Sequence, residues 1–378
     1  MKRLSELSVE GKKVFLRADL NVPIKNSVIL DEHRIIKVIP TINALLDAGA
    51  KQVIIASHLG RPKGVDTSYS LEPVSQRINE LLDVEVDFAQ DCIGPISNKP
   101  VVILENTRFY EEDKKNDKAF AQQLLHGASI YVFDAFGAAH RNHASTTGVL
   151  DFVEDAGIGL LTAKELKALS FKEPGRPFVG IVGASKVSDK IPLLEGLLER
   201  VDTLLLGGAV IFTFYRALGL EVGKSLVEED MVVHAKKLLE VYKDKIVLPI
   251  DIVVSETAEG NEIFTVEYDK IPLNMIGFDI GDASIELFEE KLRNVQTVFW
   301  NGPLGLFEVH PFEHATTEIA QYLSSKKINT IIGGGDTERA VHKYVDGFSH
   351  VSTGGGAALE LVAGKKLVVL ESLKKFSE

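Results

Sequence analysis

Short apolar runs rich in β-branched residues alternate with longer amphipathic stretches along the whole chain. Such runs are typical of buried strands, and the stretches with a 3.6-residue period predict helices between them. We expect strands at 14–16, 53–56, 101–104, 130–133, 178–182, 203–206, 246–248, 297–300, 330–332 and 367–370. We expect helices at 34–48, 71–82, 119–125, 160–171, 191–200, 229–241, 315–324 and 337–345. This alternation predicts stacked βαβ units, which is an α/β fold with mainly parallel sheets.

With 378 residues the chain exceeds one ordinary hydrophobic core, so two domains are expected. The best boundary lies near 151–177, where Gly157 and Gly159 precede a helical run that ends before the cluster 174–177 (PGRP). A helix between glycines and a Pro-Gly cluster is typical of a connector with hinge points, although an ordinary surface helix is the alternative. We expect a first domain at 1–157, a connecting helix at 158–172 and a second domain at 173–364.

Loops that begin where apolar runs end carry residues suited to a phosphate. Seven such loops begin at Arg17, Ser57, Arg108, Asp134, Gly183, Asn301 and Gly333. In open parallel sheets, ligands bind just beyond the carboxyl ends of the strands. The loops therefore predict an enzyme that handles phosphorylated substrates.

Composition and charge narrow the class of protein. The net charge of −12 argues against nucleic acid as the main partner, because binding to a phosphate backbone needs a broad basic surface. The positive loops therefore indicate a local anion pocket. Cys92 is the only cysteine and is interpreted as a small buried thiol in a reducing compartment. The first residues lack the apolar core of a signal peptide and no apolar run is long enough to span a bilayer, so we expect a cytoplasmic enzyme without a membrane partner.

The first half of the chain supplies cationic candidates. They are Arg17, Arg34, His58, Arg61, Arg108 and Arg141. The planar fork of arginine matches carboxylate and phosphate oxygens, and a small substrate with several negative oxygens needs such a ring. Asp19 and Asn21 follow the same strand as Arg17 and can either bond substrate hydroxyls or hold the arginines in place. Arg34 opens a helix, and both a functional and a surface role are open for it.

The second half carries glycine runs in place of arginines. Gly333–Gly335 and Gly354–Gly356 each precede a helix, so that converging backbone N–H groups can cradle phosphoryl oxygens; flexible turns are the alternative. Asp336 can hold Mg²⁺, and Thr337 can cap the helix or contact a phosphate.

Lys186 and Lys190 are four residues apart after a strand and can face the same anion, or form a solvated pair. The chain has no clear nucleophile pair, and direct phosphoryl transfer needs none.

Two competing functions are weaker. An NAD-dependent oxidoreductase would carry the G-x-G-x-x-G turn, which the sequence lacks. A segment at 219–225 resembles a phosphate-binding P-loop but is one residue short of the required spacing. A non-catalytic phosphometabolite-binding protein on the same fold would tolerate the loss of Arg34 or Lys190, and both are present.

Eight motifs resemble those of phosphoglycerate kinases and occur in the order of that family. They are RADLNVP, SHLGRP, ENTRF, DAFGAAHRNHAS, KVSDK, FWNGPLGLFE, GGGDT and HVSTGGGAALEL; the first begins at Arg17 and the last contains Gly356. The resemblance implies two Rossmann-like three-layer lobes joined by a helix, with the tail at about 365–378 completing the first lobe. It implies reversible, Mg²⁺-dependent phosphoryl transfer between 1,3-bisphosphoglycerate and ADP, giving 3-phosphoglycerate and ATP, by in-line transfer with hinge closure. We expect a monomer.

The resemblance also assigns residues to sites. It implies a 3-phosphoglycerate site formed by Asp19, Asn21, Arg34, His58, Arg61, Arg108 and Arg141. It implies a nucleotide site, with Glu308 on the ribose and Asp336 on Mg²⁺, formed by Gly183, Lys186, Gly207, Gly208, Gly281, Asn301, Pro303, Glu308, Gly334, Gly335, Asp336 and Thr337. The residues implied in stabilising the transferred phosphoryl group are Arg34, Lys190, Gly334 and Gly356.

Six positions depart from the family pattern, among them Val210 and Ile211, where methionine and alanine are usual. Glycine is usual at the positions of Ala184 and Ala209, alanine at that of Ser185, and proline is common at that of Asp282. A side chain in place of glycine can narrow the adenine slot or exclude a positive φ. These departures therefore bear on nucleotide affinity and base preference rather than on the reaction.

Overall fold

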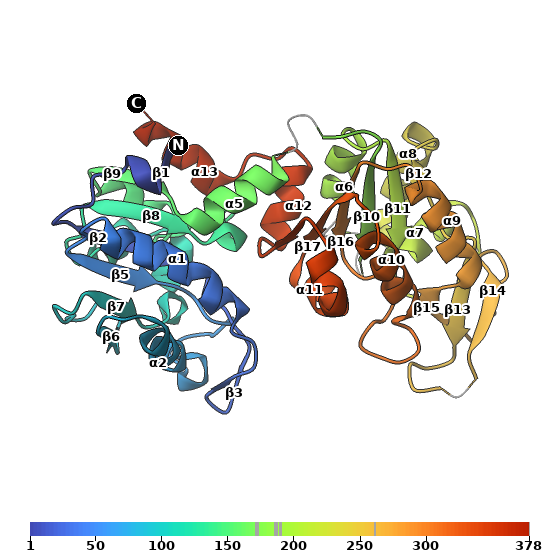
Figure 1. Ribbon diagram of the computed structural model, residues 1–378. Coiled ribbons are helices and arrows are strands. Elements are labelled where there is room, and N and C mark those ends of the chain that lie inside the picture. The colour runs from blue at the N-terminus through green and yellow to red at the C-terminus, as the bar shows by residue number, and fades with distance from the viewer. Residues whose placement is uncertain (171–173, 185–187, 189–190, 261, 378) are drawn as a thin grey trace. The chain divides into compact units, whose positions relative to one another are not determined.

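The computed structural model describes residues 1–170, 174–184, 188, 191–260 and 262–377. Lys186, Lys190 and Ser185 lie outside these residues. The chain divides into two compact units (Figure 1), of which the first comprises Met1–Lys167 with Lys366–Glu378 and the second Ala168–Lys365. Within the part of the chain that is described, no helix combines the length and the apolar character needed to cross a membrane.

The first unit is built on a parallel sheet of seven strands in the order β1-β9-β8-β2-β5-β7-β6. Its strands are β1 (Lys2–Arg3), β2 (Lys13–Ala18), β5 (Gln52–Ala56), β6 (Val86–Ala89), β7 (Val101–Leu104), β8 (Ile130–Asp134) and β9 (Asp155–Ile158). β5, β7 and β8 are buried along their whole length, as expected of strands covered on both faces. A short hairpin joins β3 (Ile24–Lys25) to β4 (Val28–Ile29).

Helices connect the strands of this unit. The α-helices are α1 (His33–Asp47), α2 (Glu72–Leu81), α3 (Glu111–Lys115), α4 (Lys118–Leu124), α5 (Leu160–Leu169), which continues into the second unit, and α13 (Val368–Leu373). Short 3₁₀ turns are η1 (Leu4–Glu6), η2 (Thr67–Tyr69), η3 (Thr107–Phe109), η4 (Phe136–Ala138), η5 (Gly148–Asp151) and η8 (Lys374–Phe376). The apolar face of α1, with Ile35, Val38, Ile42 and Leu45, is buried in the core.

The second unit contains a parallel sheet of six strands in the order β12-β11-β10-β16-β17-β18 and an antiparallel sheet in the order β14-β13-β15. The strands are β10 (Phe178–Gly183), β11 (Thr203–Gly207), β12 (Ile246–Val247), β13 (Asp251–Ser255), β14 (Phe264–Glu267), β15 (Ile276–Ile280), β16 (Thr297–Asn301), β17 (Asn329–Gly333) and β18 (His350–Ser352). The helices are α6 (Ile191–Leu198), α7 (Val210–Ala217), α8 (Val232–Val241), α9 (Asp282–Leu292), α10 (His314–Ser324), α11 (Gly335–Ala340) and α12 (Gly356–Val362), with 3₁₀ turns η6 (Glu229–Met231) and η7 (His342–Gly347).

The predicted α/β fold with mainly parallel sheets is confirmed, but the strand predicted at 367–370 is wrong. These residues belong to helix α13, which buries Val369, Leu370 and Leu373 on one face. Its backbone is fixed to the first unit where Val369 N donates to Ala139 O at 3.1 Å. A four-residue apolar run does not distinguish a buried strand from one turn of a buried helix, which explains the error.

Candidate functional site

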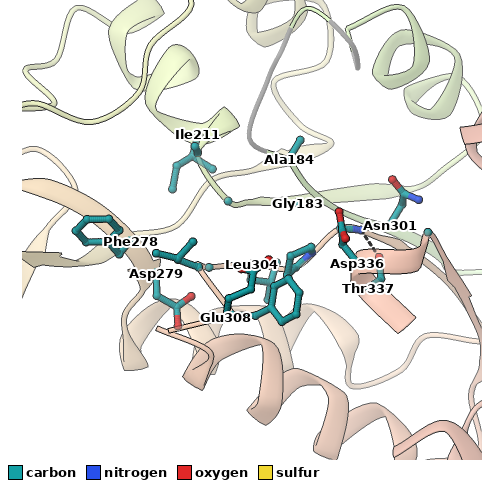
Figure 2. A pocket seen from close by; sticks show the side chains of 18 of the residues that line it. Gly183, Ala184, Ile211, Phe278, Asp279, Asn301, Leu304, Glu308, Asp336 and Thr337 are labelled. Carbon is teal, nitrogen blue, oxygen red and sulfur yellow. Dashed lines mark hydrogen bonds between the residues drawn. The ribbon is translucent and has the colours of Figure 1, made fainter. Parts of the chain in front are cut away.

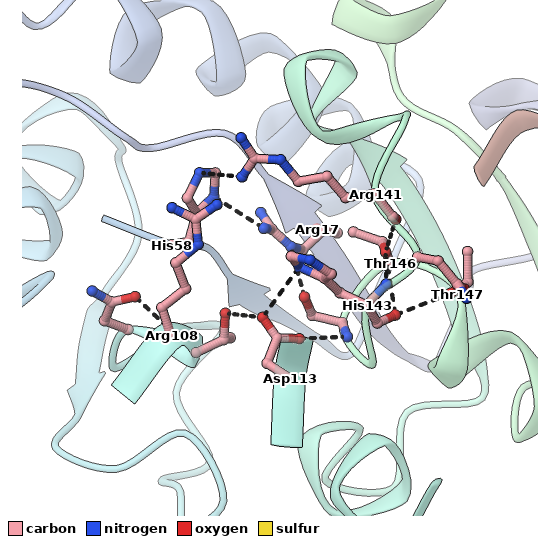
Figure 3. Close-up of polar contacts among 12 residues, drawn as sticks. Arg17, His58, Arg108, Asp113, Arg141, His143, Thr146 and Thr147 are labelled. Atoms are coloured by element: carbon pink, nitrogen blue, oxygen red, sulfur yellow. Dashed lines mark hydrogen bonds and ion pairs between the residues drawn. The ribbon is translucent and has the colours of Figure 1, made fainter. Parts of the chain in front are cut away.

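Polar loops of the first unit meet at one edge of its sheet. β2 pairs in parallel with β5 on one side and with β8 on the other. The carboxyl ends of these three strands therefore lie at the same edge of the sheet. Arg17 lies at the end of β2, His58 follows β5, and Arg141 follows β8 and η4. Arg108 lies in η3 after β7. Figure 3 shows these side chains converging, and we refer to Arg17, Arg34, Arg108, Arg141 and His58 as the arginine cluster.

Arg17 is a buried cation with neutral partners. Its side chain is only 1% exposed, its Nε donates to Ser145 Oγ at 3.1 Å, and Nη1 donates to Ala18 O. Nη2 lies 3.1 Å from His58 Nδ1. Burying a charge against neutral acceptors costs free energy, and an anion nearby offsets that cost. This arrangement therefore indicates an anion site.

Arg34 opens α1 and forms an ion pair with the buried carboxylate of Asp19. The other oxygen of Asp19 accepts from Asn21 N at 3.3 Å, and Asn21 Oδ1 accepts from Gly60 N at 2.8 Å. Of the two alternatives left open by the sequence, Asp19 here holds an arginine in place. Asn21 likewise fixes the loop that carries Arg61.

The remaining cations lie around this ion pair. Arg108 donates to Gly60 O, and its backbone N donates to Asn106 Oδ1 at 3.1 Å. Arg61 is exposed in the loop after Gly60. Burial lowers the pKa of Arg141, and the positive charges of Arg17, Arg61 and Arg34 lower it further against the opposing effect of Asp19. The lowered pKa of Arg141 therefore reflects its burial first and the neighbouring positive charges second.

Two further residues of this region were not identified from the sequence. Asp113 is fully buried, accepts from Ser145 N at 2.9 Å and from Thr107 Oγ1 at 3.0 Å. It therefore fixes the segment whose hydroxyl bonds Arg17. His143 lies 3.9 Å from Asp113, and burial lowers its pKa. Asp113 lies in an ordinary acidic stretch, YEED, so no sequence signal distinguishes it.

The second unit contains a cavity of about 600 Å³ (Figure 2). We call it the glycine-lined cavity because much of its wall is backbone, from Gly183, Gly208, Gly302, Pro303, Gly305, Gly334, Gly335, Gly355 and Gly356. Another part of the wall is apolar and is formed by Ile211, Phe212, Leu226, Phe278, Leu304, Leu306 and Phe307. Asn301, Glu308, Asp336 and Thr337 also line it. An apolar slot beside a wall of backbone amides suits a flat ring with an attached anion.

Glycine is required where two loops cross at this cavity. A Cβ on Gly183 would lie 1.8 Å from Pro303 O, and a Cβ on Gly302 would lie 1.7 Å from Gly183 O. Gly302 also has φ +93°, a conformation that side chains disfavour. The loops after β10 and β16 therefore pack backbone against backbone.

Departures from the family pattern cause no backbone strain here. Ala209 has φ −66° and ψ −16°, which alanine adopts freely, and Ala184 is not among the residues with positive φ. Both line the cavity, so their methyl groups act on its width. Asp282 opens α9, a first-turn position where both proline and acidic residues are favoured, and it does not line the cavity.

Buried hydrogen bonds fix the β16 and β17 loops. Thr337 Oγ1 accepts from Gly302 N at 2.6 Å and donates to Gly333 O at 2.8 Å. Asn301 Nδ2 donates to the same carbonyl at 2.8 Å. The hydroxyl of Thr337 is fully buried, so its observed role is to hold the loop rather than to reach outward.

Arg339 contacts three residues that line the cavity and was not predicted from the sequence. Its Nη2 lies 2.8 Å from Asp336 Oδ1 and 3.8 Å from Glu308 Oε1. The guanidinium lies 5.4 Å from the centre of the Phe307 ring. The only sequence signal is its spacing of three residues from Asp336, which predicts a helical ion pair.

The carboxylates at the cavity determine whether it can hold a divalent cation. In the described ranges no group of three or more His, Cys, Asp and Glu side chains is placed to hold a metal ion. Asp336 nevertheless presents an exposed carboxylate to the cavity, and Mg²⁺ commonly takes one or two carboxylates with phosphate oxygens and water. The site therefore fits Mg²⁺ that arrives with a nucleotide.

Two predicted nucleotide residues lie away from the cavity wall. A Cβ on Gly207 would lie 2.4 Å from Leu304 Cδ2, and one on Gly281 would lie 2.2 Å from Asp251 Oδ2. Both glycines thus allow close packing behind the cavity rather than lining it. Gly356, by contrast, does line it. Lys186 and Lys190 fall outside the described residues, so the structure places neither.

Comparisons with known proteins agree on one family. The family model described as phosphoglycerate kinase matches residues 4–365. The chain is 50% identical to the cytosolic phosphoglycerate kinase of Triticum aestivum, over 96% of each protein. It is 50% identical to chloroplastic phosphoglycerate kinase 1 of Arabidopsis thaliana, over 96% of this chain and 80% of that protein. The solved structure of phosphoglycerate kinase from Coxiella burnetii matches with a TM-score of 0.88 and 35% identity, over 100% of both chains.

Proposed function

Since the chain belongs to the phosphoglycerate kinase family, we propose that its arginine cluster binds 3-phosphoglycerate and its glycine-lined cavity binds the adenine nucleotide. The protein is a kinase that catalyses the reversible transfer of a phosphoryl group between 1,3-bisphosphoglycerate and ADP, giving 3-phosphoglycerate and ATP in glycolysis. The observation that carries the acid-site assignment is the buried Arg17, which is hydrogen-bonded to Ser145, Ala18 and His58 and to no carboxylate among the described residues.

The arginine cluster suits an acid that carries both a carboxylate and a phosphate. Arg108 and Arg141 present guanidinium groups that can bind such oxygens in pairs, and the exposed Arg61 adds a cation at the rim. Asp19 holds Arg34 at the start of α1, which is the position we propose for contact with the transferred phosphoryl group. Asn21 completes this site by fixing the Gly60 loop.

The glycine-lined cavity suits a nucleotide in a defined orientation. Its apolar wall takes the adenine ring, and we propose that Glu308 binds the ribose hydroxyls. The first-turn amides of α11 and α12, at Gly335 and Gly356, support placement of the phosphates at this end. We propose Mg²⁺ as the cofactor, held by Asp336 together with phosphate oxygens. Bound Mg²⁺ supplies charge neutralisation for the transferring group.

Direct phosphoryl transfer needs a protein that positions the substrates and stabilises negative charge, and it needs no protein nucleophile. We propose that Arg34, with Lys190 and the backbone at Gly334 and Gly356, stabilises the charge on the transferred group. Closing the site would also exclude water, which otherwise hydrolyses the acyl phosphate. We propose that the segment 158–172, which contains α5, supplies the hinge of a two-domain enzyme.

A coupled assay tests these assignments. The purified chain is supplied with 1,3-bisphosphoglycerate and Mg-ADP, and ATP formation is followed. Arg34→Ala is expected to lower kcat by about 10²–10³-fold, because the charge it neutralises develops in the transition state, while acid binding weakens far less. Arg3→Ala, which removes an exposed arginine of the same unit, is the matched control. An equal loss in kcat and in acid affinity would contradict the role of Arg34.

The finer biological setting is also a proposal. We propose a monomer in the cytoplasm that has neither nucleic acid nor a membrane as partner. The net charge of −12 and the single, buried Cys92 support this setting, although relatives of similar identity carry cytosolic and chloroplastic names. Light scattering after gel filtration tests the monomer, and a dimer mass would contradict it.

A further inference from the structure

His58 lies between the guanidinium groups of Arg17 and Arg141, which can donate hydrogen bonds but cannot accept them. Arg17 Nη2 lies 3.1 Å from His58 Nδ1, and Arg141 Nη1 lies 3.4 Å from His58 Nε2 (Figure 3). A guanidinium group carries N–H donors and no acceptor. A neutral imidazole has one acceptor nitrogen, and an imidazolium has none. His58 can therefore accept from only one of the two arginines.

The geometry favours Arg17 as the donor. Arg17 is 1% exposed and is held at its other nitrogens by Ser145 Oγ and Ala18 O, so it cannot turn away without losing buried hydrogen bonds. Arg141 is less buried, and its distance to His58 is at the long end of hydrogen bonding. Its Nε has a separate acceptor in His140 Nε2, at 3.4 Å. His58 Nδ1 is thus the acceptor, and the ring proton is on Nε2.

We propose that Arg17 is a positioning residue that holds His58 as a neutral imidazole with its proton on Nε2, so that His58 presents a fixed N–H donor to the acid substrate. This inference rests on the proposed function of the arginine cluster as the acid site. In this state Arg141 and His58 Nε2 present two donors to each other. An anionic oxygen beside the pair, within hydrogen-bond distance of both nitrogens, accepts from both, which makes this a position for a substrate oxygen.

The surrounding charges support a neutral ring. His58 faces Arg17 from β2, Arg34 from α1, and Arg141 and His143 from the segment after β8. Burial lowers the pKa of His58 well below its ordinary value, and Arg17, Arg141 and Arg34 lower it further. The positive charge of the site then comes from arginines, which do not titrate near neutral pH. Binding of the acid is accordingly independent of His58 protonation around pH 7.

Nitrogen NMR of the full-length chain with ¹⁵N-labelled histidine tests the proposal at neutral pH, with His58→Gln used only to assign the signals. The expected result is one tautomer, with an unprotonated Nδ1 and a protonated Nε2, both before and after addition of 3-phosphoglycerate. A proton on Nδ1, or a doubly protonated ring, in the wild-type protein would overturn the inference.

Variants separate positioning from a general structural effect. In Arg17→Met, His58 is expected to lose its single tautomer and its pKa is expected to rise. Arg17→Lys still presents a donor to Nδ1 and is expected to keep the single tautomer. Arg141→Met is expected to keep it. Retention of the tautomer in a folded Arg17→Met protein would also contradict the proposal. If 3-phosphoglycerate shifts none of the His58 signals, the acid-site assignment fails; if it binds to the other tautomer, only the present inference fails.

Discussion

Replacing Thr337 with valine removes one hydroxyl and almost no volume in the wall of the glycine-lined cavity. In the wild-type protein that hydroxyl accepts from Gly302 N at 2.6 Å and donates to Gly333 O at 2.8 Å. The Gly333 carbonyl keeps a second donor, Asn301 Nδ2 at 2.8 Å, so it stays satisfied in the variant. The Gly302 N–H loses its acceptor. The substitution therefore leaves one group, the Gly302 N–H, without a hydrogen-bond partner, whereas the Gly333 carbonyl keeps one.

The magnitude follows from that count. An unsatisfied buried donor costs about 1–3 kcal/mol, and Gly302 is half-buried, so about 1–2 kcal/mol is expected. With a urea dependence of about 2 kcal/mol per M, the unfolding midpoint of the second unit falls by about 0.5–1 M. Because Gly302 and Pro303 line the cavity, Mg-ADP binding weakens as well.

The chain provides a probe for this unit alone. Trp300 is the only tryptophan, is fully buried in β16, and donates from Nε1 to Gly302 O at 2.7 Å. Its fluorescence during urea unfolding reports on the second unit, and calorimetric titration reports on Mg-ADP binding. Thr337→Ser is the matched control, because it keeps the hydroxyl and should keep nucleotide affinity. If Thr337→Val unfolds at the wild-type midpoint and binds Mg-ADP equally well, the hydroxyl does not hold the loop.

Two further predictions concern acidic residues. Asp336→Ala is expected to raise the Mg²⁺ concentration needed for ADP binding about tenfold, which is equivalent to about 1.4 kcal/mol. Arg339→Ala removes a cation that competes for the Asp336 carboxylate and should lower that concentration. An unchanged Mg²⁺ dependence in Asp336→Ala would refute the metal assignment. Burial raises the pKa of Asp134 from 3.8 to about 6, so folding favours the protonated carboxyl. The resulting stabilisation of the folded state is complete below pH 3.8 and is lost as the pH rises through 6. Relative to Asp134→Asn, the first unit should lose about 3 kcal/mol across that window, as measured by hydrogen exchange of β8 amides; parallel pH profiles would contradict this.

The parallel sheets could be predicted because their strands are continuous apolar runs bounded by turns. β14 has no such run, since most of its residues are exposed, and the antiparallel sheet was therefore not predicted. β9 lies in the segment interpreted as a domain boundary, but its Asp155 pairs with Lys2 while Ala156, Gly157 and Ile158 are buried. Where polar residues begin or edge a strand, composition alone does not reveal the pairing.

The positions of the site residues could be predicted because these residues follow the ends of predicted strands. Their side-chain contacts could not be predicted in this way. Parallel strands bring their carboxyl ends to one edge, so Arg17, His58 and Arg141 could be grouped from the sequence. The contact of Arg339 with Glu308 and the support from Asp113 depend on how side chains meet after folding. Gly207 and Gly281 carry the same sequence signal as cavity glycines, because a glycine needed for packing looks identical in the sequence.

The discontinuity of the first unit has a consequence for biosynthesis. Its last helix, α13, contributes Val369, Leu370 and Leu373 to burial, yet these residues leave the ribosome after the entire second unit. The second unit is contiguous from Ala168 to Lys365, so its last residue emerges before α13 does. The nascent chain therefore reverses the usual order, because the half that emerges first is finished last.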